Sequence, residues 1–267
     1  MLNEIILGDC LEAMMYIPDK SVDMILCDLP YGTTACKWDT VIPFKPLWEQ
    51  YKRIIKDNRA IVLTASQPFT TALGASNIEM LKYAWCWEKS NAGDCMNVKN
   101  KPMKKHEDIL VFSNGTTANK SERRMLYNPQ GLTPCTKKRS GCDYSTTNEH
   151  SFKAPRPSHK AYIQEFENYP IDLIYFPNDK NAVHPTQKPV ALFEYLIKTY
   201  TNEGDTVLDN CIGSGTTAIA CLSTKRNFIG IEKEEKYWKI AIDRIEKHKL
   251  NMIPNISFRN KEFMERQ

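Results

Sequence analysis

The stretch Val22-Asp23-Met24-Ile25-Leu26-Cys27-Asp28-Leu29-Pro30-Tyr31 decides the fold predicted for this chain. An apolar run of this length that contains β-branched residues is typical of a strand buried on both faces. Pro30 has no backbone N–H and a fixed φ, so the strand must end there. Asp28 and Tyr31 are therefore expected on a stiff turn at the carboxyl end of a strand, where ligands bind in open α/β sheets.

This turn suits a narrow range of ligands. A carboxylate and the carbonyl before a proline both accept hydrogen bonds from an amine, and an aromatic ring can stack on a flat ring. Together they fit a planar heterocycle that carries an amino group, such as adenine or cytosine. Taken alone, the turn is equally compatible with an ordinary strand-to-loop connection whose aspartate caps a helix.

Strands and helices alternate with short links through most of the chain, which predicts an α/β fold with a doubly wound, mostly parallel sheet. The predicted strands cover residues 4–9, 22–28, 60–64, 81–87, 109–112, 206–209 and 227–232. The predicted helices cover residues 10–16, 47–55, 68–75, 190–200, 217–222 and 235–248.

Residues 114–175 interrupt this alternation, because they carry little periodicity and many turn-forming residues. The segment is too long for a simple connection in a compact domain. Its composition leaves two interpretations open, a solvated insertion or a surface that contacts phosphates and bases. The predicted nucleic-acid contacts are its basic residues Arg123, Arg124, Lys137, Lys138 and Arg139, which are interleaved with aromatic residues.

A glycine-containing loop, Asn210-Cys211-Ile212-Gly213-Ser214-Gly215-Thr216-Thr217, follows the strand that ends at Asp209. Its glycines allow backbone to approach a ligand closely and leave the N–H groups of the next helix pointing at it. Glu232 ends the following strand and is well placed to bind both hydroxyls of a ribose. By itself the loop fits a dinucleotide fingerprint or another nucleoside site, although a nicotinamide enzyme usually begins with this unit.

Composition and charge narrow the class of protein. The chain has 267 residues, of which 42% are hydrophobic and 25% charged, as in ordinary globular proteins. Its net charge of +4 is compatible with a nucleic-acid partner. The nine cysteines are scattered without a CxxC pair, which favours reduced thiols in a cytoplasmic protein and predicts no metal site. Residues 1–9 do not resemble a signal peptide, and no apolar run approaches membrane-spanning length.

Two of these sites together resemble a known family, the β group of amino-group DNA methyltransferases that use S-adenosylmethionine. That group carries an Asp/Ser/Asn-Pro-Pro-Tyr tetrad first, then a target-recognition segment, and then the cofactor loop. Asp28-Leu29-Pro30-Tyr31 stands in the place of the tetrad, and Asp209 to Thr217 in the place of the loop. His184 to Pro189 resembles the short motif that precedes this loop.

The resemblance implies a circularly permuted, Rossmann-like methyltransferase sheet. Residues 1–113 would form the catalytic half, residues 114–175 the inserted target-recognition segment, and residues 176–267 the cofactor half. The implied reaction is methyl transfer from S-adenosylmethionine to N6 of adenine in double-stranded DNA, after the base is flipped out of the duplex. Cytosine N4 is the alternative target, but the acid in the tetrad favours adenine, because many cytosine enzymes carry Ser there.

The resemblance also assigns roles to individual residues. Tyr31 would stack on the base, while Asp28 and the carbonyl at Leu29 or Pro30 would accept hydrogen bonds from the amino group, so catalysis would rest on orientation and electrostatics. The implied catalytic residues are Asp28, Pro30 and Tyr31. The implied cofactor residues are Asp9, Cys10, Lys188, Asp209, Gly213, Ser214, Gly215, Thr216 and Glu232.

Two departures from the family pattern keep other functions open. Leu29 replaces the first proline of the tetrad, and Asn210-Cys211 replaces the commoner Pro-Phe after Asp209. A DNA-binding protein with a dead cofactor site is therefore one alternative. A nicotinamide oxidoreductase, which leaves Asp28 and Tyr31 without a role, and a methyltransferase of RNA or protein amides are others. The resemblance also raises a homodimer and a cognate restriction endonuclease as partners beside the DNA.

Overall fold

The structure is a computed structural model that describes residues 2–34, 36, 39–141, 160–179 and 187–252. The chain forms two compact units, one made of Met1–Asn128 with Asp172–Gln267 and the other of Pro129–Ile171. The larger unit contains the sheet expected from the sequence and is described first.

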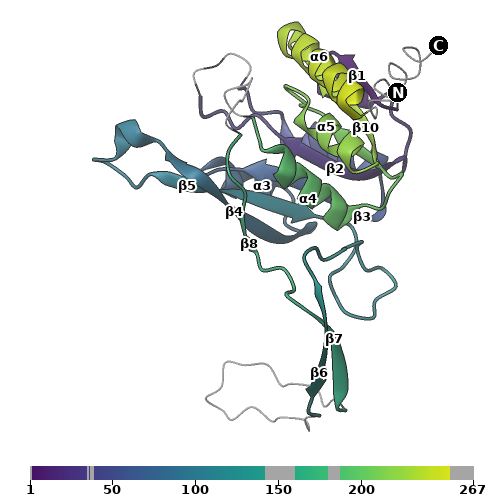
Figure 1. The fold of residues 1–267 in the computed structure, drawn as a ribbon. Coiled ribbons are helices and arrows are strands. Elements are labelled where there is room, and N and C mark those ends of the chain that lie inside the picture. Colours follow the sequence, from purple (N-terminus) through teal and green to yellow (C-terminus); the bar gives the residue numbers. More distant parts are fainter. Residues whose placement is uncertain (1, 35, 37–38, 142–159, 180–186, 253–267) are drawn as a thin grey trace, which may run out of the picture. The chain divides into compact units, whose positions relative to one another are not determined.

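The larger unit is built on one eight-stranded sheet with the order β1-β10-β9-β2-β3-β5-β4-β8 (Figure 1). Only β5 runs antiparallel to its neighbours β3 and β4, so the predicted mostly parallel sheet is confirmed. Its strands are β1 (Glu4–Leu7), β2 (Val22–Asp28), β3 (Ile55–Ala65), β4 (Leu81–Gly93), β5 (Lys104–Phe112), β8 (Leu173–Tyr175), β9 (Thr206–Asp209) and β10 (Asn227–Glu232). Its helices are α1 (Cys10–Met14), α2 (Phe44–Ile54), α3 (Phe69–Ser76), the short 3-10 helix η1 (Cys95–Asn97), α4 (Val190–Tyr200), α5 (Thr216–Ser223) and α6 (Glu235–Met252).

Strands β2 and β9 are neighbours in the sheet although they are far apart in the chain. They pair in parallel, with Met24 opposite Val207 and Ile25 opposite Leu208. From β2 the chain passes through α2 to β3 on one side, and from β9 it passes through α5 to β10 on the other side. The direction of winding thus reverses between β2 and β9, which is where open α/β sheets form their ligand crevice.

A buried carboxylate joins these two strands at the amino end of β2. Asp23 is 3% exposed, and its Oδ2 accepts a hydrogen bond of 3.0 Å from the backbone N–H of Thr206 in β9. The same carboxylate forms ion pairs with Lys56 at 2.8 Å and Arg59 at 3.1 Å. A buried charge is stable only when it is paired and hydrogen-bonded, so these contacts favour the observed position of β2 beside β9.

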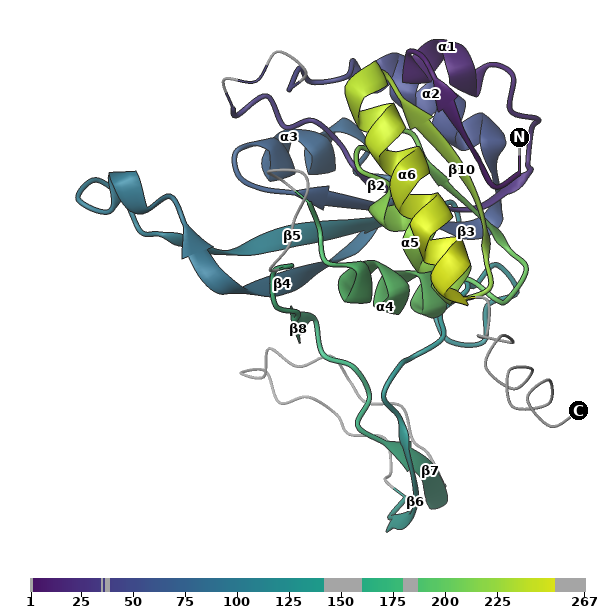
Figure 2. The ribbon, with the colours of Figure 1, turned by 45° about the horizontal axis from the view of Figure 1, so that its top comes forward.

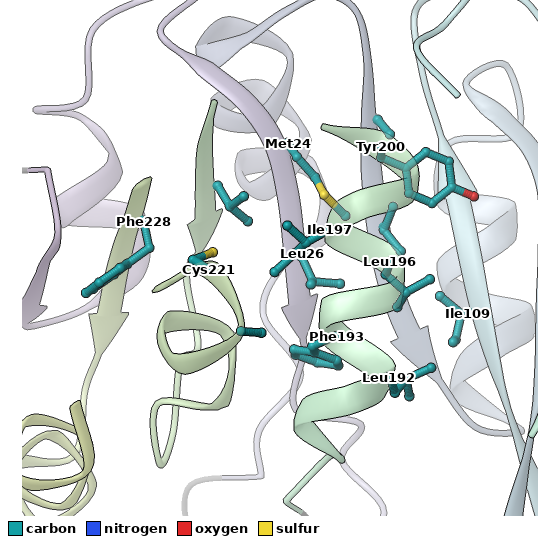
Figure 3. Close-up of a cluster of buried hydrophobic side chains, with 14 of the residues drawn as sticks. Met24, Leu26, Ile109, Leu192, Phe193, Leu196, Ile197, Tyr200, Cys221 and Phe228 are labelled. Atoms are coloured by element: carbon teal, nitrogen blue, oxygen red, sulfur yellow. The ribbon is translucent and has the colours of Figure 1, made fainter. Parts of the chain in front are cut away.

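Helices cover both faces of the sheet (Figure 2). Side chains of β2 alternate between the two faces, because successive residues of a strand point in opposite directions. Met24 and Leu26 pack with α4, α5 and α6, whereas Ile25 and Cys27 pack with α1, α2 and α3. Figure 3 shows side chains of α4, including Phe193, beside those of β2. This two-sided burial explains why β2 is apolar at almost every position rather than at alternate ones.

The smaller unit contains a hairpin in which β6 (Thr133–Arg139) pairs antiparallel with β7 (Tyr162–Glu167). The sequence predicted an inserted segment over residues 114–175, but residues 114–128 and 172–175 belong to the larger unit. Met125 is buried there, and the backbone N–H of Leu126 donates to Asn58 O at 3.1 Å. One buried side chain and isolated backbone hydrogen bonds leave no periodic signal in a sequence.

Across the described residues, we find no helix that combines the length and the apolar character needed to traverse a bilayer.

The packing of α4 leads to a test of the core. Leu196 is fully buried between α4 and the sheet, so Leu196→Ala should leave a cavity and lower the free energy of unfolding by about 2–5 kcal/mol in urea denaturation. Leu250→Ala is the matched control, because Leu250 of α6 is 67% exposed and should change it by less than about 0.5 kcal/mol. Equal effects at both positions would contradict this placement of α4.

Candidate active site

A cavity of about 580 Å³ lies at the carboxyl ends of β2, β9 and β10. Asp28, Pro30 and Tyr31, the predicted catalytic residues, all line it. The predicted cofactor residues that line it are Asp9, Cys10, Lys188, Asp209, Gly213, Ser214, Thr216 and Glu232. The two sites that the sequence suggested separately therefore share one cavity.

Asp28 lies at the end of β2 with both carboxylate oxygens engaged. Oδ1 accepts hydrogen bonds from the hydroxyls of Tyr31, at 2.8 Å, and Thr64. Thr64 stands directly opposite Asp28 in the pairing of β2 with β3. Oδ2 accepts a hydrogen bond of 2.7 Å from the ammonium of Lys188. The carboxylate is thus held by a neighbouring strand on one side and a lysine on the other.

Lys188 belongs to a cluster of alternating charges, which we call the Asp28–Lys188–Glu107–Lys89 cluster. Its Nζ lies 3.3 Å from Glu107 Oε2, and Glu107 Oε1 lies 2.9 Å from Lys89 Nζ. Burial alone would lower the pKa of Lys188, but the charges of Asp28 and Glu107 outweigh burial and raise it. Burial would likewise raise the pKa of Glu107, but Lys188 and Lys89 outweigh it and lower the pKa. Both groups are therefore charged at neutral pH.

Tyr31 is held on several sides. Its ring stacks on Phe69 with centroids 5.2 Å apart, and Lys188 Nζ lies 5.5 Å from the ring centroid. Burial and the carboxylates of Asp28 and Glu107 raise the pKa of the phenol well above its usual range, so it remains a hydrogen-bond donor. In this state the Tyr31 hydroxyl occupies a position on Asp28 that the amino group of a ligand could take.

The loop from Tyr31 to Thr34 forms part of the cavity wall and is anchored by one acid. Asp39 accepts hydrogen bonds from the backbone N–H groups of Gly32 at 2.8 Å, Thr33 at 2.9 Å and Thr34 at 2.7 Å. Burial would raise the pKa of Asp39, but these hydrogen bonds outweigh it and lower the pKa. Trp38, next to this acid, is outside the described residues.

The glycine loop uses its two glycines differently. Both have positive φ, +53° at Gly213 and +86° at Gly215, which other residues rarely adopt. Gly213 lines the cavity, whereas Gly215 is not among the lining residues. A Cβ at Gly215 would lie 3.1 Å from the Cβ of Ala241, so this glycine lets α6 pack closely against the start of α5.

Asp209 shapes the loop from within. It is 3% exposed, and its carboxylate accepts hydrogen bonds from the backbone N–H of Cys211, at 3.0 Å, and from the hydroxyl of Thr217. Burial raises its pKa to about 7, although these two hydrogen bonds act in the opposite direction. The carboxylate thus ties the end of β9 to the first turn of α5.

Two other acids of the cavity keep a structural role as well. Glu232 accepts hydrogen bonds from the backbone N–H groups of Gly213 at 2.9 Å and Glu234 at 2.8 Å. Asp9 caps α1 by accepting one from Leu11 N at 2.9 Å. Each carboxylate oxygen can accept more than one hydrogen bond, so both acids can still bind hydroxyl or amino groups of a ligand. With the backbone of the glycine loop, they form an acceptor set that fits a nucleoside.

Small polar residues stand where the resemblance expects a proline and an aromatic ring. Asn210 Oδ1 accepts a hydrogen bond of 2.5 Å from the hydroxyl of Tyr51 in α2. The Cys211 thiol is hydrogen-bonded to the thiol of Cys10, and both residues line the cavity. This hydrogen bond, together with burial, raises the pKa of Cys10, so it stays a neutral thiol. The same hydrogen bond would lower the pKa of Cys211, but a hydrogen bond with Cys27 and burial outweigh it and raise the pKa well above its usual range, so neither thiol is activated as a nucleophile.

Glu107 and Thr64 contact the predicted catalytic residues, and Lys89 contacts Glu107, but none of the three was predicted as a site residue. Because β5 runs antiparallel to β3, residues near the start of β5 lie at the same edge of the sheet as the end of β2. The periodicity of the sequence does not show that β5 is antiparallel. It therefore could not show that Glu107 lies near Asp28. The position of Thr64 at the end of a predicted strand was a usable signal.

The predicted nucleic-acid contacts lie outside the cavity. Arg123 and Arg124 are exposed in the larger unit. In the smaller unit, Lys137 forms an ion pair with Glu167, and Arg139 donates to Gln164 Oε1 at 2.8 Å. Lys138 is exposed on the same strand. Of the motif from His184 to Pro189, residues 184–186 are outside the described residues.

Comparisons with known proteins show the family of this chain. A model of the N6/N4 DNA methylase family matches residues 22–243. The DNA adenine methyltransferase YhdJ of Escherichia coli K12 is 28% identical over 258 residues, which cover 91% of this chain and 82% of YhdJ.

Solved structures have the same fold. That of the M1.HpyAVI–SAM complex has a TM-score of 0.58 at 24% identity and covers 90% of this chain and 98% of its own. The structure of the cytosine-N4-specific PvuII DNA methyltransferase has a TM-score of 0.62 at 14% identity. The match covers 92% of this chain and 89% of the PvuII chain.

The raised pKa of Asp209 predicts an effect of pH on stability. The folded protein keeps a proton here up to about pH 7, whereas the unfolded chain loses it near the ordinary value of 3.8. The contribution of Asp209 to the free energy of unfolding therefore falls as the pH rises from about 4 to 7. Relative to the wild type, Asp209→Asn should gain stability over this range in urea denaturation. A difference that does not change with pH would contradict the shift.

Proposed function

The chain belongs to the N6/N4 DNA methylase family, and on that premise we propose that it methylates N6 of adenine in double-stranded DNA. The observation that carries this proposal is the shared cavity, in which the Asp28 carboxylate and the glycine loop stand at the ends of neighbouring strands. A methyl donor held by the loop and an amino group held by Asp28 would thus meet without a large movement of the sheet.

S-Adenosylmethionine is the proposed cofactor, and it supplies a methyl group on a positively charged sulfur. The acceptor set described above fits its groups. Glu232 would bind the ribose hydroxyls and Asp9 the adenine edge, while the backbone at Gly213 and Ser214 would lie against the methionine part. The thiols of Cys10 and Cys211 line this wall, and Cys211 stands where the resemblance expects an aromatic ring, which changes the shape of the wall but removes no hydrogen-bonding group.

The chain's own residues would orient the target base. The base must leave the duplex to reach this cavity, as for other enzymes that act on bases. Its amino group would replace the Tyr31 hydroxyl at Asp28 Oδ1, and the carbonyl at Leu29 or Pro30 would accept the second amino hydrogen. These acceptors direct the nitrogen lone pair at the methyl group, and the proton that nitrogen later loses can pass to Asp28.

Adenine is favoured over cytosine for two reasons. The catalytic turn carries an acid, which the resemblance associates with adenine enzymes, and the chain is similar over most of its length to an adenine methyltransferase. N4 methylation of cytosine is the second candidate, since the family includes both reactions. We place the activity in the cytoplasm, as expected from the scattered cysteines; a homodimer and a cognate endonuclease stay predictions.

The test of this proposal is transfer of a labelled methyl group from S-adenosylmethionine to unmethylated duplex DNA, followed by identification of the nucleosides by mass. Label in N6-methyladenine supports the proposal, and label in N4-methylcytosine supports the second candidate. If DNA of varied sequence takes no label while calorimetry detects cofactor binding, the substrate is RNA or protein. Absence of cofactor binding as well supports a DNA-binding protein with a dead cofactor site.

The central role of Asp28 can be tested directly. We expect Asp28→Ala to remove methyl transfer, because the amino group loses its charged acceptor, while the affinity for S-adenosylmethionine changes by less than about threefold. Single-turnover assays and calorimetry measure the two quantities. Asp28→Asn is the control for folding, since it keeps the shape of the side chain. Joint loss of transfer and cofactor binding in both variants would make Asp28 structural instead.

The basic residues outside the cavity predict a change in the salt dependence of DNA binding. Replacing both Arg123 and Arg124 with glutamine should weaken DNA binding and reduce the slope of log affinity against log salt by about 0.9 for each phosphate that is no longer neutralised. Lys225→Gln is the control, because Lys225 is exposed beside the amino end of β10, away from the cavity. An unchanged slope in the double variant would exclude this pair from the DNA surface; the same assay applies to Lys137, Lys138 and Arg139.

A further inference from the structure

We propose that Lys188 is a positioning residue for Asp28 and not a ligand of the cofactor. It would hold Asp28 Oδ2 so that Oδ1 faces the amino group of the target base. This inference rests on the proposed function and changes the role that the family resemblance gave to this lysine.

The position of the ammonium group supports this role. Lys188 is 6% exposed, and its Nζ lies 2.7 Å from Asp28 Oδ2 and 3.3 Å from Glu107 Oε2. The ammonium thus lies between two carboxylates, donates a hydrogen bond to Asp28 and forms an ion pair with Glu107. Moving this ammonium toward the carboxylate of a cofactor would remove the hydrogen bond on Asp28 Oδ2 and one of the two ion pairs of Glu107, both of which are partly buried.

The two oxygens of Asp28 are used differently, which explains why one partner must be fixed. Oδ2 is bound by Lys188, whereas Oδ1 is bound by the hydroxyls of Tyr31 and Thr64. When an amino group replaces the Tyr31 hydroxyl, Lys188 and Thr64 remain. These two contacts, from opposite sides, prevent the carboxylate from rotating about its last torsion and keep Oδ1 aimed into the cavity.

Glu107 and Lys89 complete the arrangement. Glu107 lies between the two lysines, with Lys89 Nζ at 2.9 Å from its other oxygen. The Asp28–Lys188–Glu107–Lys89 cluster holds two negative and two positive charges, so this part of the cavity has no net charge and suits a neutral base. Burial lowers the pKa of Lys188, and the charge of Glu107 helps Asp28 to raise it again. Glu107 thereby keeps Lys188 protonated and able to donate its hydrogen bond to Asp28.

The decisive variants are Lys188→Met, which removes the charge, and Lys188→Arg, which restores it. Lys198→Met is the matched control, since Lys198 is exposed on α4. We expect Lys188→Met to lower the single-turnover rate by about 100-fold, the loss expected when a reacting group is misplaced by about 1 Å. The affinity for S-adenosylmethionine should change by less than about threefold. Lys188→Arg should recover part of the rate, and Lys198→Met should match the wild type.

Glu107→Gln supplies a second readout that a purely structural role would not alter. This variant keeps the size of the side chain but removes one of the two charges that raise the pKa of Lys188. Lys188 should then lose its proton at lower pH than in the wild type, while Asp28 and Tyr31 still contact it. The rate of methyl transfer should therefore decline at a lower alkaline pH in Glu107→Gln than in the wild type.

Each of the following results would overturn the inference. One is a Lys188→Met variant with weak cofactor affinity but a normal rate at saturating cofactor, which would make Lys188 a cofactor ligand. Another is a normal rate in folded Lys188→Met. If both Lys188 variants fail to fold, an unchanged pH profile in Glu107→Gln overturns it. Rates are measured on whichever methylated base the wild type forms. Label in cytosine would therefore reject the adenine proposal but not the positioning role of Lys188. No methylated product at all would reject both.

Discussion

The parallel pairing of β2 with β9 is the constraint on which the rest of the structure depends. It joins two strands whose linked residues, Asp23 and Thr206, are 183 positions apart in the chain. Because both strands are parallel, their carboxyl ends lie at the same edge of the sheet, and the chain leaves them in opposite directions. The crevice that results contains the proposed catalytic turn after β2 and the glycine loop after β9. If the two strands were separated, each motif would remain but the common cavity would not.

Strand β2 carries a buried or half-buried carboxylate at each end, and the two serve different purposes. At its amino end, Asp23 is surrounded by Lys56, Arg59 and the backbone N–H of Thr206, which ties the strand to its neighbours. At its carboxyl end, Asp28 is bound by Lys188 and two hydroxyls, all of which lie in or beside the cavity. Between them lie only apolar residues and one thiol, buried on both faces. The same electrostatic requirement, that a buried charge needs partners, stabilises the fold at one end and orders the proposed active site at the other.

Several residues of the cavity stabilise the fold as well as line the site. Asp9 caps α1, Asp209 joins β9 to α5, and Glu232 binds the backbone of the glycine loop. Each of these three acids can therefore hold its helix or loop in place and also bind a ligand. Gly215 differs, because its lack of a side chain serves the packing of α6 against α5 rather than contact with the cavity.

The sequence by itself determined the α/β class, the mostly parallel sheet and the order of the two motifs, because alternating apolar strands and amphipathic helices are local patterns. It also pointed to Asp28, Tyr31, Asp209, Gly213 and Glu232, which line the cavity, since residues at strand ends and in glycine loops can be recognised without tertiary contacts. Cys10 and Lys188, which line it too, were expected only from the family resemblance. Only the tertiary structure decided that β5 is reversed, that Glu107 therefore reaches Lys188, and that Lys188 binds Asp28. Residues 114–128 likewise joined the sheet unit through isolated contacts. These features depend on contacts between side chains that are far apart in the chain. Such contacts leave no periodic pattern in the sequence.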